Sequence, residues 1–129
     1  MVPSNSGSQQ PEEVLLEKML QLAKIIASHL AAGEFDAVDA ITGSKRLPAK
    51  QMMYWLDCNN LKMSPAPDEC FEKQSVGKGV HVYKFGSGGW SFDIPVFVDG
   101  EESDFTLQLS FALDANGNIV TELDDLHVL

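Results

Sequence analysis

The stretch Phe105–Leu113, FTLQLSFAL, decides the fold class because its apolar residues fall on every second position. Successive residues of a β-strand point to opposite faces of the sheet, so this spacing predicts a strand with one apolar and one polar face. The sequence Asp114-Ala115-Asn116-Gly117 follows directly. Asn and Gly accept the positive φ that tight hairpins require, so the chain is expected to turn there and return as a further strand over 119–129.

The same period of two begins upstream, just after Gly79. Residues 80–85 alternate, and a longer alternating face is formed by Trp90, Phe92, Ile94, Val96 and Val98. Pro95 lies inside this second strand and cannot donate a hydrogen bond to a neighbouring strand. The strand is therefore expected to be an edge or to be bulged at Pro95.

The last strand contains a change of parity. Its apolar positions are odd-numbered from Ile119 to Leu123 and even-numbered from Leu126 to Val128. If one face of the strand stays buried throughout, one extra residue must be inserted between these two groups. The sequence therefore predicts a β-bulge near Asp124-Asp125.

The residues before Gly79 follow helical spacing instead. Pro11 and the glutamates after it suit the start of a helix, and Gly33 suits its end. The apolar face of this helix is predicted to hold Leu16, Met19, Leu20, Ala23, Ile26, Ala27 and Leu30. A second short helix is expected from Phe35 up to Gly43. A third is expected from Pro48, carrying Met52, Trp55 and Leu56.

These patterns predict an α+β fold, with two or three N-terminal helices packed on one face of a four-stranded antiparallel meander sheet. A chain of 129 residues is long enough for a single domain with one core. We expect a flexible tail over 1–10 and a single domain over 11–129. Within that domain, helices occupy 11–58, a connection with at most one short turn, around Asp68 to Phe71, occupies 59–79, and the sheet occupies 80–129.

Composition limits the classes of function. The hydrophobic fraction of 44% and the charged fraction of 22% are typical of a folded globular protein. No apolar run approaches the roughly 20 residues of a membrane helix, and the first residues lack a secretory signal, so a cytoplasmic protein is expected. The net charge of -10 argues against a nucleic-acid partner. Cys58 and Cys70 have no CxxC spacing, so neither a metal site nor a redox motif is predicted.

Negative charge is concentrated in the part of the chain that is predicted to form the sheet. From Val80 onward the sequence contains nine carboxylates, and Lys84 is its only Lys or Arg. Such a surface speeds association with cationic partners, and it also keeps a protein in solution. The charge asymmetry alone does not choose between these two roles.

The C-terminal residues Asp124, Asp125 and His127 are the best candidates for a site. These residue types can bind a divalent metal or share acid and base roles. On a regular strand, however, Asp125 and His127 share a face while Asp124 points away, which leaves too few ligands for a metal in one place. Neighbouring strands could supply more from Asp93, Glu102 or Asp104. No catalytic residue, metal or cofactor is predicted. The sequence leaves open whether these residues form a binding site or only the end of a strand.

A second acidic segment precedes the strand that starts at Phe105. Glu101 and Glu102 belong to an expected loop over 98–102, and Ser103-Asp104 follows it. The pair Ser103-Asp104 suits a turn closed by a side-chain hydrogen bond, or the rim of a binding surface.

Several motifs in the last third of the chain occur together. Trp90 leads a strand with an internal Pro95, Glu101-Glu102 precedes SDFTL at 103–107, and the chain ends on DDLHVL at 124–129. With these motifs, Trp90 to Leu129 resembles the C-terminal part of a bacterial family of uncharacterised domains. The resemblance implies a compact α+β domain and carries no known activity.

Two functions from different classes follow. The first is a small cytosolic binding module, of the immunity-protein or antitoxin kind, that holds a basic protein partner. Its expected binding residues are Glu101, Glu102, Asp104, Asp124, Asp125 and His127. The second is a small-molecule-binding or enzymatic pocket between a curved sheet and its helices, as in cystatin-like or nuclear-transport-factor-like folds, which would need a cavity of about 300 Å³ or more. The charge asymmetry favours the first. A bare edge strand would also permit a homodimer.

Overall fold

The computed structural model describes residues 11–43, 47–86 and 88–128. The helices are α1 (Glu12–Ala31), α2 (Phe35–Thr42) and α3 (Ala49–Cys58). The strands are β1 (Met63–Ser64), β2 (His81–Lys84), β3 (Trp90–Val98), β4 (Glu101–Leu113) and β5 (Ile119–Val128), with two 3-10 turns, η1 (Asp68–Phe71) and η2 (Lys73–Ser75), between β1 and β2. The tail expected over 1–10 lies outside the described residues.

The helix bounds agree with the sequence signals at both ends of α1. Pro11 precedes its first turn, and Gly33, with a φ of 78°, follows its last turn. The buried stripe is the predicted one, except that Leu15 is buried and Leu16 only half-buried. The third helix predicted from Pro48 is confirmed as α3; it turns Ala49, Met52 and Leu56 toward the core and leaves Trp55 37% exposed.

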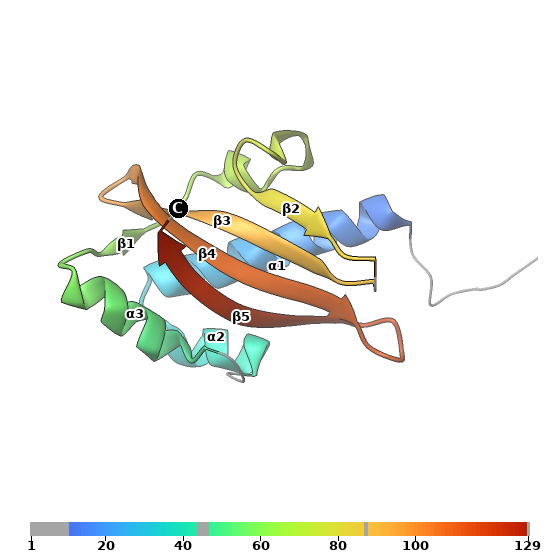
Figure 1. Ribbon diagram of the computed structural model, residues 1–129, viewed down its shortest axis with the longest axis horizontal. Coiled ribbons are helices and arrows are strands. Elements are labelled where there is room, and N and C mark those ends of the chain that lie inside the picture. Colours follow the sequence, from blue (N-terminus) through green and yellow to red (C-terminus); the bar gives the residue numbers. More distant parts are fainter. Residues whose placement is uncertain (1–10, 44–46, 87, 129) are drawn as a thin grey trace, which may run out of the picture.

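The four expected strands form the predicted antiparallel meander, β2 to β5. A fifth strand, β1, comes from the connection and pairs with the far end of β3, where Met63 lies opposite Val98. Both β1 and β2 lie on the same side of β3, next to its two ends (Figure 1). Strand β1 was not predicted, because its two residues are too few to show a period.

The two alternatives predicted for Pro95, a strand edge and a bulge, are both present. The pairing of β2 with β3 ends at Asp93 and that of β1 begins at Phe97, so no described strand pairs with β3 at Pro95 on that side. On the other side the register with β4 shifts between Pro95 and Phe97. The hydroxyl of Ser103 bridges this irregular region, because it donates to the carbonyl oxygen of Val96 at 2.6 Å and accepts from the amide of Phe105 at 3.1 Å. The turn expected at Ser103 is thus a side-chain-bonded bulge within β4.

The helices cover one face of the sheet, as predicted. Figure 1 shows α1 running behind β3 and β4, with α2 and α3 beside β5. The rings of Phe92 and Phe111 meet between the sheet and α1, with their centroids 4.6 Å apart. The largest fully buried side chains join α1 and α3 to the sheet; they are Met19, Leu20, Ile26, Leu30, Met52, Leu56, Phe92, Ile94, Leu107, Leu109, Phe111 and Leu123.

Candidate functional site

The face of the sheet that α1 leaves uncovered is polar. This polarity follows from strand alternation, since a residue between two core positions points away from the helices. Across β3, β4 and β5 the register sets Ser91, Ser110 and Glu122 in one row and Asp93, Gln108 and Asp125 in the next. We call this surface the open face. It comprises Ser91, Asp93, Thr106, Gln108, Ser110, Glu122, Asp124, Asp125 and His127.

The predicted β-bulge in β5 is confirmed, and it brings an extra carboxylate to the open face. Asp125 lies opposite Gln108 and Leu123 lies opposite Leu109, so Asp124 is the inserted residue. On a regular strand two consecutive residues point to opposite faces, so only one of the two aspartates would lie on the open face. In the bulged strand Asp125 lies opposite Gln108, and the Oδ2 atom of Asp124 accepts a hydrogen bond from the hydroxyl of Ser110. Two consecutive carboxylates therefore share one face.

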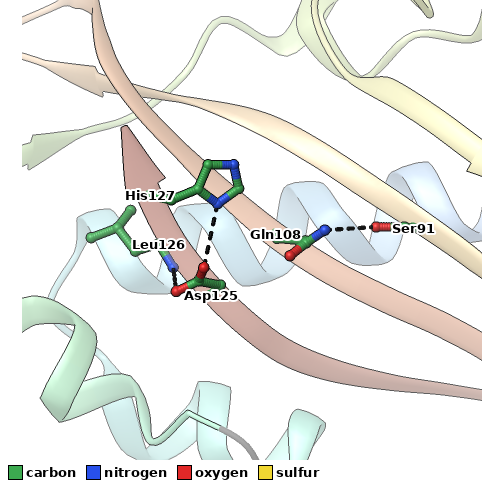
Figure 2. A network of polar contacts seen from close by, with 5 residues as sticks. All are labelled: Ser91, Gln108, Asp125, Leu126 and His127. Atoms are coloured by element: carbon green, nitrogen blue, oxygen red, sulfur yellow. Dashed lines mark hydrogen bonds and ion pairs between the residues drawn. The ribbon is translucent and has the colours of Figure 1, made fainter. Parts of the chain in front are cut away.

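The candidates Asp125 and His127 interact directly. The Nδ1 atom of His127 lies 3.5 Å from Oδ2 of Asp125, and Oδ1 of Asp125 accepts from the amide of Leu126 at 2.9 Å (Figure 2). Their side chains are 34% and 48% exposed, so both remain accessible from solvent. Beside them, Nε2 of Gln108 donates to the hydroxyl of Ser91 at 3.2 Å, across β3 and β4 (Figure 2).

An open depression of about 710 Å³ lies over this part of the sheet. Glu122, Asp124 and Asp125 line it from β5, and the half-exposed ring of Phe85 lines it from the end of β2. No Lys or Arg is among the described residues that line it. Lys84 is held elsewhere, because it pairs with Glu12 of α1 and its ammonium lies 5.9 Å from the centroid of the Trp90 ring.

The other predicted binding residues lie apart from this depression. Glu102 lines a second, smaller depression of about 200 Å³ between β2, β3 and β4. Glu101 and Asp104 are exposed and line neither depression. The loop expected over 98–102 was wrong, because only Asp99 and Gly100 are outside strands, and both have positive φ (53° and 81°), the conformation of a tight two-residue hairpin.

Six open-face residues were not among the predicted binding residues. They are Ser91, Asp93, Thr106, Gln108, Ser110 and Glu122. Their signal was present, since each stands between two apolar positions of a strand, except Glu122, which follows Thr121. Alternation identifies the face of a residue, but pairing register is needed to show which of these residues are neighbours.

A metal site and a reactive thiol each need particular surroundings among the described residues. Among residues 11–43, 47–86 and 88–128, no three His, Cys, Asp or Glu side chains are placed to hold a metal ion. Burial raises the pKa of the Cys70 thiol, and the nearby carboxylate of Glu102 raises it further. A raised pKa favours the neutral thiol, which is the poorer nucleophile.

Comparison with known proteins places the chain in a family. Residues 27–129 match the family model described as "Domain of unknown function (DUF7668)". The chain belongs to this family. The predicted resemblance to a family of uncharacterised domains is therefore confirmed, and the match extends from the end of α1 through β5. No curated protein and no solved structure matches the chain. None of the helices in the described ranges is long and apolar enough to span a membrane.

Proposed function

We propose that this chain is a small acidic binding module of the bacterial cytosol, and that its open face holds a basic segment of a protein partner, as an immunity protein or an antitoxin would. The observation that carries the proposal is the β5 bulge, which turns Asp124 to the same face as Asp125. With Glu122 these residues surround a depression that no described Lys or Arg lines.

The charge distribution explains why a basic partner fits. The sequence carries a net charge of -10, and the only Lys or Arg after Val80, Lys84, is paired with Glu12. Complementary charge accelerates encounter and penalises partners of the same sign. The exposed rings of Tyr83 and Phe85 beside the acidic rows add apolar surface, against which the stem of a Lys or Arg side chain can pack.

The small-molecule alternative receives less support from the packing. It requires a cavity between the sheet and its helices, of about 300 Å³ or more. Large side chains meet in that space, including Met19 of α1, Phe92 of β3 and Phe111 of β4, and each of them is at most 1% exposed. The depression of about 710 Å³ lies on the opposite side of the sheet, in the open face.

The proposal is tested with a defined probe, an eight-residue peptide of alternating Lys and Ser, and a Glu–Ser peptide of the same length. Binding is measured by calorimetry at low and high salt. We expect the Lys peptide alone to bind, and its affinity to fall as salt screens the charges. The triple variant E122Q/D124N/D125N should weaken binding by about tenfold, which corresponds to roughly 0.5 kcal/mol for each exposed pair.

The matched control is D36N/D57N/E69Q, which removes the same charge from exposed positions in or near the helices. It should weaken binding by no more than about twofold, as expected from the change in overall charge alone. Equal losses in the two triple variants would show that only net charge matters. Binding that is insensitive to salt would also count against the proposal.

A further inference from the structure

The smaller depression on the open face contains a carboxylate oxygen that no described residue bonds. This depression, of about 200 Å³, is formed by residues of β2, β3, β4 and the end of the connection, and we call it the Asp93 recess. His81, Asp93 and Thr106 are among the residues that line it. The Oδ1 atom of Asp93 is buried and has no hydrogen-bond partner among the residues that the structure describes.

Three donors near Asp93 do not bond its Oδ1 atom. Gln108, opposite Asp93 in β4, gives its amide to Ser91. The hydroxyl of Ser103, which also lines the recess, donates to Val96. Lys78 lines the recess as well, but it is exposed and forms no ion pair with Asp93 in the described part of the chain. A buried carboxylate oxygen that is left unbonded weakens the folded state, and the donor of a ligand would remove that penalty.

We propose that the Asp93 recess receives the ammonium group of one lysine side chain of the basic segment, with Oδ1 of Asp93 as its acceptor. This inference rests on the proposed function, because the recess belongs to the same open face. Its size fits a single side-chain end, since about 200 Å³ is below the roughly 300 Å³ of small-molecule pockets. Lysine fits better than arginine, because a guanidinium favours two parallel acceptors and the recess offers one orphaned oxygen.

The rings of Tyr83 and Phe105 also line the recess. They provide apolar walls for the four methylene groups of a lysine stem. The exposed carboxylate of Glu102 lies in the lining too and adds negative charge there. A cation with a flexible apolar stem therefore matches both the chemistry of the walls and that of the orphaned oxygen.

The test uses a single-residue probe, so that it does not depend on the basic peptide. Isotope-labelled protein is titrated with N-acetyl-lysine methylamide, and with the arginine and norleucine analogues, while amide shifts in β2, β3 and β4 are followed by NMR. We expect the lysine probe to bind most tightly. D93N should weaken it at least tenfold, whereas D99N, an equal charge change in the hairpin turn, should change its dissociation constant less than twofold.

A stability measurement separates a binding role from a structural one. D93N should keep the wild-type melting temperature or raise it by about 2–5 °C, because an amide is less costly to bury than an unpaired carboxylate. A fall in melting temperature that K78A reproduces would mean that Asp93 pairs with Lys78 in solution, and would overturn the proposal. Equal binding by D93N and wild type, or tighter binding of the arginine analogue, would overturn it too. Failure of the Lys–Ser peptide alone, with the lysine probe still binding through Asp93, would reject the proposed function and keep the recess as an amine site.

Discussion

Neighbouring residues of each strand lie on opposite faces of the sheet, and the two faces have different roles. On the inner face Phe92, Leu109 and Leu123 form a row in which every side chain is at most 1% exposed. One residue further along β3, Asp93 begins the open-face row that continues through Gln108 and Asp125, and all three are partly exposed. The inner row stabilises the fold by burying apolar surface. The open row contributes less to stability, and its polar groups are available to a partner. Substitutions on the two faces should therefore separate stability from binding.

The largest effect is expected on the inner face. F92A removes a fully buried ring that packs against Phe111, and the cavity that remains should lower the free energy of unfolding by about 3–5 kcal/mol. Urea denaturation measures this change. The matched open-face variant is Q108A, which loses one partly buried hydrogen bond and should cost about 1 kcal/mol or less. Similar losses in F92A and Q108A would contradict the division between the faces.

A smaller loss of stability is expected where the connection meets the open face. A Cβ atom at Gly79 would lie 2.7 Å from the backbone oxygen of Cys70 and 2.8 Å from its Cα atom, so G79A should cost about 1–3 kcal/mol through overpacking. Gly86 provides the control, since a Cβ there meets nothing within 4 Å. Thermal unfolding of G79A and G86A compares the two. A neutral G79A would show that the end of the connection is not packed against η1 as described.

Loss of the Ser103 hydroxyl from the bulge in β4 should lower the free energy of unfolding by about 1–2 kcal/mol. S103A leaves the carbonyl of Val96 and the amide of Phe105 without the hydroxyl that bonds both. S103T keeps a hydroxyl at this position and should stay within about 0.5 kcal/mol of wild type. Denaturant titration of the two variants tests whether the hydroxyl, and not the size of the side chain, holds the bulge.

The smallest effect is expected in the β4–β5 hairpin and depends on pH. The backbone amide of Asn118, and then that of Asn116, donates to the carboxylate of Asp114 and holds its pKa below the usual value. A lowered folded-state pKa means that the charged form stabilises the fold above the unfolded pKa, near 3.8, and that this contribution is lost as the pH falls through the folded pKa. D114N should therefore have a lower melting temperature than wild type at pH 7, and this difference should shrink below a pH of about 3.5. A pH-independent difference in melting temperature would contradict this cause.

The sequence predicted the fold well where a period could be read. Alternation identified the buried face of β3, and a parity change within β5 located the bulge at Asp124-Asp125 before any pairing was known. Both predictions worked because burying one face fixes the phase of a strand. The Asp99-Gly100 hairpin was missed, although Asp-Gly is a strong turn signal, since the acidic run around it suggested a longer loop.

The candidate site was less predictable, because it depends on which residues become neighbours across strands. Asp124, Asp125 and His127 are adjacent in sequence and were found, but the recess at Asp93 is made by residues of β2, β3 and β4. No local pattern marks Asp93 as lacking a hydrogen-bond partner. Its Oδ1 atom is left unbonded by the described residues while Gln108, opposite Asp93, donates to Ser91 instead. Only pairing register and side-chain geometry reveal this arrangement.

The most direct test of the central claim is to map where the Lys–Ser peptide binds on the isotope-labelled protein by NMR. If the open face is the binding surface, the amide shifts should be concentrated in β3, β4 and β5, around Ser110, Glu122 and Asp125, and should leave α3 unchanged. These shifts should also be lost in E122Q/D124N/D125N, while its melting temperature stays within a few degrees of wild type. Shifts centred on α1 or α3, or shifts that persist in the triple variant, would contradict the account.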